Sequence, residues 1–195
     1  EDIEFYSVMR AVRTIENSDI CLLLIDATRG IESQDLNIIS LILKNNKGMI
    51  ILVNKWDLVS KETNTALLFE KEIRSKSAPF TDYPILFISA TNKQRIHKIL
   101  ETVDKVNENR NRKITTSELN QTLLEITREN PPPAIKEKFI KIKYVTQLPV
   151  YTPSFAFFCN FPQYIKEPYK RYIENRMREK YDFSGVPVRI FFRKK

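Results

Sequence analysis

Residues 48 to 57 read Gly48-Met49-Ile50-Ile51-Leu52-Val53-Asn54-Lys55-Trp56-Asp57, and this stretch decides the fold of the first half of the chain. An apolar run without a charge is typical of a strand that is buried on both faces of a parallel sheet. The polar tetrad Asn54-Lys55-Trp56-Asp57 then stands at the carboxyl end of that strand. Because open α/β sheets bind their ligands at this edge, we expect the tetrad to belong to a binding site.

An Asn-Lys-x-Asp tetrad in this position is the pattern with which GTP-binding proteins read guanine. The Asp57 carboxylate can accept hydrogen bonds from guanine N1–H and the exocyclic amine, whereas the unprotonated N1 of adenine would repel it. An unmatched buried polar group costs about 1–3 kcal/mol, which is enough to reject adenine. We expect Asn54 to brace the loop and the Lys55 stem to lie over the base. The motif alone leaves the alternative of an ordinary Asn/Asp turn open.

A second element follows the next strand along the chain. The run Tyr83-Pro84-Ile85-Leu86-Phe87-Ile88 is short and apolar, and it ends in Ser89-Ala90-Thr91. In guanine-nucleotide folds the next strand ends in such a Ser-Ala segment, where the Ala90 backbone N–H could meet guanine O6. Both elements lie at the carboxyl ends of strands. Together they favour a guanine pocket over coincidence.

The phosphate-binding half of a nucleotide site has no counterpart in these 195 residues. No Gly-x-x-x-x-Gly-Lys-[Ser/Thr] pattern occurs, and the glycines are Gly30, Gly48 and Gly185. A phosphate cradle needs a glycine-rich turn, a lysine and a hydroxyl group for magnesium. The segment Asp182-Phe183-Ser184-Gly185 matches an Asp-x-x-Gly magnesium signature, but it follows a helical pattern, so we interpret it as a plain turn.

The order of apolar patterns predicts two domains. In the first half, helical patterns cover residues 5–17, 34–44, 61–76 and 93–106, and strand patterns cover 20–25, 48–53 and 85–88. This alternation predicts an α/β domain over residues 1–108, with a parallel sheet covered on both faces. A linker at 109–115 precedes a second domain at 116–195. There we expect helices at 116–128 and 167–180 and strands at 138–146, 154–159 and 187–193, a small α+β domain in the order αββαβ.

The charge of the chain is uneven. Residues 1–108 carry 14 Lys/Arg and 16 Asp/Glu, a net charge of −2, whereas residues 109–195 carry 18 and 8, a net charge of +10. This asymmetry indicates a polyanionic partner, and we expect RNA or ribosome contacts at basic residues of the second half. They include Lys141, Lys143, Lys170, Arg171, Arg189 and Arg193. A merely solvated basic face is the alternative. Phe155, Phe157 and Phe158 could stack bases, but their spacing favours a core.

The remaining features of the composition bear on the cellular compartment and argue against a disulfide and a metal site. The chain has no signal-peptide pattern and no apolar run long enough to span a membrane, so we expect a cytoplasmic protein without a membrane partner. Cys21 and Cys159 fall in separate predicted domains, which favours buried free thiols over a disulfide. The single histidine, His97, lies on a polar helical pattern, so we expect no metal site within the chain.

The whole chain closely resembles the Der (EngA) family of bacterial GTPases. The resemblance rests on residues 3–11, on Leu24-Ile25-Asp26-Ala27, and on the tetrad and Ser89-Ala90 described above. In the tail it rests on residues 141–144, Pro153-Ser154-Phe155 and residues 185–188, which resemble the family's KH-like domain. The first half corresponds to the C-terminal part of the family's second GTPase domain, a P-loop fold.

The resemblance implies a function for the parent protein. In this family two GTPase domains precede the KH-like domain, and the protein assists assembly of the large ribosomal subunit. It implies GTP or GDP as ligand, with Asn54, Lys55 and Asp57 reading guanine and Ser89 and Ala90 beside the base. It also implies ribosomal RNA, the large subunit and the preceding GTPase domain as partners. Magnesium is expected in the parent protein through residues absent here.

Departures from the family pattern limit what this chain can do. The phosphate loop, the magnesium-binding Asp and the switch loops lie upstream in the family, so we assign no catalytic residue and expect no turnover by the chain alone. The KH-like domain also lacks a Gly-x-x-Gly loop, so protein or ribosome docking competes with base-by-base RNA reading. A non-catalytic RNA- or ribosome-docking module is the alternative function. An ATP-using relative is disfavoured by Asp57.

Overall fold

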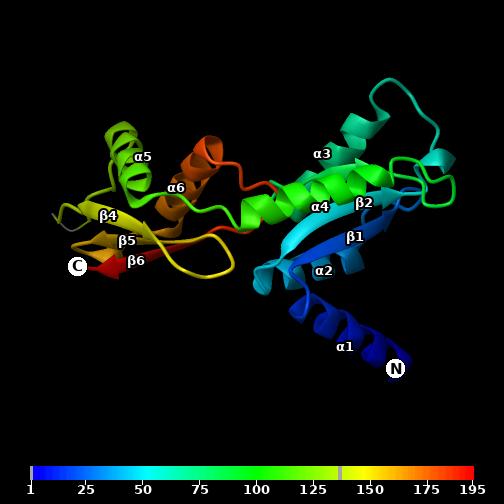
Figure 1. The fold of residues 1–195 in the computed structure, drawn as a ribbon, viewed down its shortest axis with the longest axis horizontal. Coiled ribbons are helices and arrows are strands. Elements are labelled where there is room, and N and C mark those ends of the chain that lie inside the picture. The colour runs from blue at the N-terminus through cyan, green and yellow to red at the C-terminus, as the bar shows by residue number, and fades with distance from the viewer. Residues whose placement is uncertain (1, 136–137) are drawn as a thin grey trace. The chain divides into compact units, whose positions relative to one another are not determined.

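A computed structural model describes residues 2–135 and 138–195, which form two compact units (Figure 1). The first unit runs to Asn109 and also includes Ser184–Pro187, and the second comprises Arg110–Phe183 and Val188–Lys195. The break at Asn109 adjoins the domain end expected at 108. The inclusion of Ser184–Pro187 in the first unit has no counterpart in the sequence patterns.

The first unit alternates helices and strands, as the sequence predicts. Its elements are α1 (Asp2–Glu16), β1 (Ile20–Asp26), α2 (Ser33–Lys44), β2 (Gly48–Asn54), the 3-10 turn η1 (Trp56–Leu58), α3 (Thr65–Ser77), β3 (Ile85–Phe87) and α4 (His97–Arg110). The strands form a parallel sheet in the order β1-β2-β3. Asp26 is paired with Asn54 in register, so β1 and β2 end side by side. The predicted α/β class with a parallel sheet is confirmed.

Both faces of the central strand β2 are buried against helices. Met49, Ile51 and Val53 belong to a core that includes residues of α2 and α3. Ile50 and Leu52 point to the other face, where they join a second core with Val106 of α4. This two-sided burial explains why β2 reads as a continuous apolar run and not as an alternating one.

Two helices of the first unit begin four residues later than predicted, for local reasons. The helix expected from residue 61 begins at Thr65, whose hydroxyl accepts a hydrogen bond from Glu62 N–H at 2.8 Å and closes a turn there. The helix expected from residue 93 begins at His97, because Lys93 and Arg95 have φ angles of 53° and 59°. Those left-handed conformations cannot continue a right-handed helix.

The second unit has the predicted order αββαβ. It consists of α5 (Thr116–Glu129), β4 (Ile142–Gln147), β5 (Ser154–Cys159), the 3-10 turn η2 (Pro162–Tyr164), α6 (Glu167–Lys180) and β6 (Arg189–Lys194). The sheet order is β4-β5-β6, with β4 antiparallel and β6 parallel to β5. Both helices lie on one face of this sheet (Figure 1). Strand β4 begins at Ile142 and not at 138, because the Asn160 side chain bonds the backbone of Phe139 and Lys141 in place of a strand.

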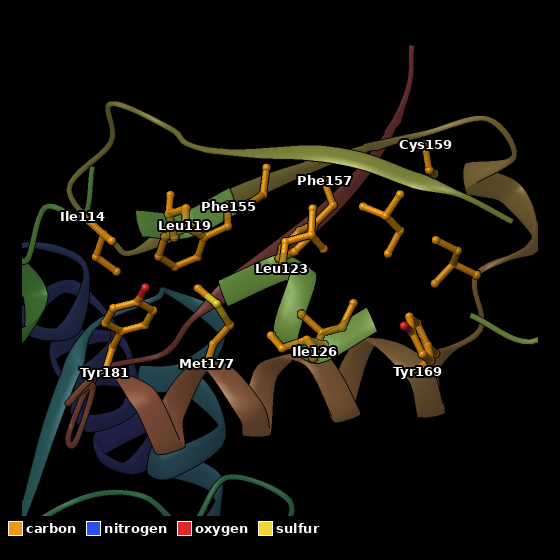
Figure 2. Close-up of a cluster of buried hydrophobic side chains, with 14 of the residues drawn as sticks. Ile114, Leu119, Leu123, Ile126, Phe155, Phe157, Cys159, Tyr169, Met177 and Tyr181 are labelled. Atoms are coloured by element: carbon orange, nitrogen blue, oxygen red, sulfur yellow. The ribbon is translucent and has the colours of Figure 1, made fainter. Parts of the chain in front are cut away.

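The core of the second unit fills the space between its sheet and its two helices (Figure 2). Phe155 and Phe157 of β5 are 0% and 1% exposed and contribute to this core, so the prediction that they are core residues is confirmed. Phe158 differs, because it points to the opposite face of the sheet, where its ring stacks on Tyr144. The helix-free face of the sheet therefore carries aromatic side chains of its own.

The plain turn expected at residues 182–185 lies at Ser184 and Gly185, and the segment Ser184–Pro187 is built into the first unit. Gly185, at φ 80°, accepts a hydrogen bond from Met49 N–H at 2.8 Å and donates one to the Asp82 carbonyl at 2.9 Å. Val186 is fully buried in the core that contains Val106. The segment thereby adds backbone contacts at the start of β2, at the end of that strand remote from the tetrad.

The cysteines and the histidine take ordinary structural positions. Cys21 and Cys159 are free thiols in different units, and burial raises the pKa of each. His97 is the exposed first residue of α4. Within residues 2–135 and 138–195, no helix combines the length and the apolar character that crossing a membrane would require.

Candidate functional site

The two loops predicted to read guanine lie at the same edge of the first unit's sheet. Backbone hydrogen bonds hold them together beyond the end of β3: Ile88 N–H donates to the Val53 carbonyl at 2.8 Å, and Trp56 N–H donates to the Ile88 carbonyl at 3.0 Å. The tetrad and the Ser89-Ala90 segment are thus joined, although more than thirty residues separate them in the sequence.

A side chain completes this connection. The Asn54 Oδ1 atom accepts a hydrogen bond from Ala90 N–H at 3.0 Å. Asn54 therefore braces the loop as expected from the sequence. The same bond occupies the Ala90 N–H that we expected to face guanine O6, so Ala90 can reach a base only by sharing or leaving this bond.

Trp56 and Lys55 determine the shape of the turn. The Trp56 side chain is 6% exposed and packs against Phe87, with 4.4 Å between ring centroids, and against Phe69 at 5.8 Å. Lys55 adopts the left-handed conformation, with φ 60° and ψ 30°. A non-glycine residue there costs roughly 1–3 kcal/mol and persists only where its surroundings hold it. The buried indole supplies that restraint.

Asp57 follows the buried indole and is exposed to solvent. No residue in the described part of the chain donates a hydrogen bond to its carboxylate. The carboxylate thus keeps both oxygens available for the N1–H and amine donors of a guanine, which a carboxylate accepts strongly. The donor and acceptor types at this edge fit a guanine base.

Lys55 has a partner that the sequence analysis did not identify. Its Nζ atom lies 2.5 Å from Asp26 Oδ2, at the end of the neighbouring strand β1. The Asp26 carboxylate also accepts hydrogen bonds from the Thr28 backbone N–H and hydroxyl. Hydrogen bonds from Lys55 and Thr28 lower the pKa of Asp26 to about 2. The signal available in the sequence was Asp26 itself, at the end of an apolar strand run.

Ser89 is a buried residue that stabilises the loop after β3. It is 1% exposed, and its hydroxyl accepts a hydrogen bond from Asn92 N–H at 3.2 Å. Its backbone forms an isolated antiparallel bridge with Gln94. This bridge closes residues 89–94 into a tight loop and leaves Ala90 exposed at its start.

The six basic residues expected to contact RNA do not share one face of the second unit. Lys170 and Arg171 belong to α6, which packs on the helix side of the sheet. Arg189 and Arg193 lie on β6 and point to the other side, because Ile190 and Phe192 between them face the core. Lys141 and Lys143 are exposed at the start of β4, where the register shifts between Ile142 and Tyr144.

The second unit also has an open hollow of about 640 Å³. Its lining combines Arg110, Arg112 and Lys113 with residues 147–151. Among the described residues, no group of three or more His, Cys, Asp or Glu side chains is arranged to hold a metal ion.

Two family models match the two units. Residues 4–109 match the elongation factor Tu GTP-binding domain, and residues 113–193 match the KH-domain-like of EngA bacterial GTPase enzymes, C-terminal. Proteins named GTPase Der are similar over the whole chain: 59% identical in Bacteroides fragilis, 56% in Porphyromonas gingivalis and 57% in Christiangramia forsetii. Each alignment covers 100% of this chain but 45% of the relative, so the chain spans less than half of the relatives' length.

Similarity to solved structures is lower. One similar structure is a crystal structure of Era in complex with MgGDPNP and nucleotides 1506–1542 of 16S ribosomal RNA. The match covers 96% of this chain and 69% of the Era chain, at 22% sequence identity and a TM-score of 0.45. The chain belongs to the family of the elongation factor Tu GTP-binding domain, and its second unit matches the KH-domain-like model of EngA bacterial GTPase enzymes.

Proposed function

We propose that the first unit is the base-recognition part of a GTP site in a Der-like GTPase. The observation that carries the proposal is the hydrogen bond between Asn54 Oδ1 and Ala90 N–H, which brings the two guanine-reading loops together. Asp57 selects guanine through its exposed carboxylate, Lys55 covers the base plane, and Ser89 holds the second loop closed.

The proposed reaction of the parent protein is hydrolysis of GTP by water. Phosphoryl transfer of this kind depends on positioning and on neutralising the phosphate charge with Mg²⁺. These 195 residues contain no Gly-x-x-x-x-Gly-Lys-[Ser/Thr] pattern to hold the phosphates and Mg²⁺. The role of this chain is therefore to select guanine, and we expect no turnover from it alone.

We also propose that the parent protein acts in the cytoplasm in assembly of the large ribosomal subunit, with ribosomal RNA and its own preceding GTPase domain as partners. The net charge of +10 over residues 109–195 supports a polyanionic partner. The second candidate function, a non-catalytic module that docks on RNA or the ribosome, is favoured by this same charge. The two candidates differ in whether the base pocket is used.

A series of bases tests the base pocket directly. The chain is labelled with ¹⁵N, and the amide resonances of residues 54–58 and 89–91 are followed during titration with GDP, IDP and ADP. IDP keeps N1–H but lacks the exocyclic amine, and ADP lacks both donors. We expect affinity to fall in the order GDP, IDP, ADP, with shifts confined to the two loops. Equal shifts with ADP, or no shift with any nucleotide, would favour the docking module.

A further inference from the structure

The helix-free face of the second unit's sheet carries a row of aromatic rings. We call it the open sheet face; it is the side of β4, β5 and β6 opposite α5 and α6. Tyr144 pairs with Phe158 in register, and their rings stack with 4.5 Å between centroids and 15° between planes. Phe191 of β6 lies on the same side, because Ile190 and Phe192 on either side of it face the core. All three rings are half-buried, so each presents part of its surface to solvent.

Cations stand over these rings. The Arg189 guanidinium carbon lies 4.8 Å from the Phe191 ring centroid, and Lys195 Nζ lies 5.2 Å from that of Tyr144. Arg193 pairs in register with Phe158 and is exposed on the same face. The open sheet face therefore alternates flat apolar surfaces with positive charges.

The strands of this face contribute no negative charge of their own. Strands β4, β5 and β6 contain no Asp or Glu. Among the described residues, neither Arg189 nor Arg193 forms an ion pair, whereas the helix side is rich in them. Four basic residues of α6 pair with carboxylates: Lys170 with Glu167, Arg176 with Glu129, Arg178 with Glu174 and Lys180 with Glu125.

Half-buried rings interleaved with cations that, among the described residues, form no ion pair match the chemistry of single-stranded nucleic acid. Bases stack on aromatic rings and on guanidinium planes, and the cations neutralise phosphates. Duplex RNA cannot offer its base faces in this way, because they are stacked inside the helix. Single-stranded RNA carries one negative charge for each flat base, whereas a protein partner would carry fewer negative charges for each flat side chain.

We propose that the open sheet face binds single-stranded RNA, with bases stacking on Tyr144, Phe158 and Phe191 and with phosphates contacting Arg189, Arg193 and Lys195. This proposal rests on the proposed role of the parent protein on the ribosome. It adds which surface contacts RNA, the open sheet face, and which form of RNA is bound, the single strand. It also divides the basic residues expected from the sequence: Arg189 and Arg193 contact RNA, and Lys170 and Arg171 on α6 do not.

The test measures binding of the 195-residue chain to a fluorescein-labelled oligouridylate of about 12 nucleotides, by fluorescence anisotropy. A duplex of the same length serves as the competing form. Replacing two rings, Tyr144→Leu with Phe191→Leu, should weaken binding about 10- to 100-fold. Tyr144→Phe keeps its ring and should bind as the wild type does. Tyr151→Leu removes a 79% exposed ring from the β4–β5 loop and is the matched control.

Charge reversal gives a second set of variants that keeps all three rings in the chain. Arg189→Glu with Arg193→Glu and Lys170→Glu with Arg171→Glu change the net charge equally, but on opposite sides of the sheet. We expect the first pair to weaken binding strongly and to flatten its remaining salt dependence, and the second pair to weaken binding only slightly.

The outcomes separate this proposal from the proposed GTP site. Equal losses from both charge reversals, a loss from Tyr151→Leu that matches the loss from the two rings, or preference for the duplex would overturn the open sheet face as the RNA site. Absence of binding to any RNA would overturn it as well. GDP titration of the first unit is a separate measurement, so a positive result there with a negative RNA result leaves the guanine site standing.

Discussion

The Asn54 side chain and the Ala90 backbone are joined by a hydrogen bond of 3.0 Å, which connects the carboxyl end of β2 with the loop after β3. Both loops in turn rest on the buried Trp56 side chain and on the hydrogen bond from the Trp56 backbone N–H to the Ile88 carbonyl. This edge of the sheet is therefore a preformed structure, held by its own contacts. Pre-organisation of this kind lowers the conformational cost of binding.

Replacing Asn54 should loosen this edge. Asn54→Ala removes the acceptor of the Ala90 N–H, so we expect a loss of about 1 kcal/mol in the free energy of unfolding and weaker GDP binding. Trp56 is the single tryptophan of the chain, so urea denaturation followed by its fluorescence reports on the first unit. Asn92→Ala, in the same loop, is the control, because the Asn92 contact to Ser89 uses its backbone N–H. Equal stability of the two variants would contradict the bracing role.

The ion pair between Asp26 and Lys55 should be visible in the titration of Asp26. Its pKa is lowered to about 2, against about 3.9 for an ordinary Asp. A lowered pKa in the folded state contributes stability above pH 4, and that contribution is lost as the pH falls from about 4 through 2. A ¹³C titration of the Asp26 carboxyl should therefore give a midpoint near 2.

The cause of this shift can be tested separately. Lys55→Met should raise the Asp26 pKa toward its ordinary value, though not completely, because both bonds from Thr28 remain. Lys61→Met, on an exposed lysine of the same unit, should leave it unchanged. An unaltered Asp26 midpoint in Lys55→Met would show that the pair does not form in solution.

Gly185 should tolerate a side chain poorly. A Cβ there would lie 2.6 Å from Val106 Cγ2 and 3.1 Å from the Met49 carbonyl oxygen, and its φ is 80°. Gly185→Ala should therefore lower the free energy of unfolding of the first unit by about 2–4 kcal/mol, from backbone strain and crowding together. Gly30→Ala shares the positive φ, at 74°, but its Cβ would meet nothing within 4 Å. It should cost about 1–2 kcal/mol. Equal losses in urea denaturation would contradict the close packing at Gly185.

The sequence predicted those parts of the fold that leave local patterns. The run from Gly48 to Val53 predicted a buried parallel strand, and the spacing around Phe155 and Phe157 predicted a core. The tetrad was placed correctly at the end of its strand, because strand direction and the position of polar residues determine that edge.

Contacts between distant residues could not be predicted in this way. The Lys55–Asp26 pair joins residues 29 positions apart, and the Gly185–Met49 bond joins segments that share no periodicity. Left-handed conformations at Lys93 and Arg95 carry no residue signal either, since glycine and asparagine are the usual markers. The side of the sheet taken by Phe158 became clear only from its register with Tyr144.

The claim that Asp57 selects guanine is tested most directly by exchanging the base preference. The chain and its Asp57→Asn variant are titrated with GDP, XDP and ADP, with Asp104→Asn, an exposed acid of α4, as the control. An amide at position 57 can donate to the xanthine oxygen that replaces the guanine amine. The account predicts GDP binding by the wild type and Asp104→Asn, and XDP binding in place of GDP by Asp57→Asn. Unchanged GDP preference in Asp57→Asn, or no nucleotide binding by the wild type, would contradict it.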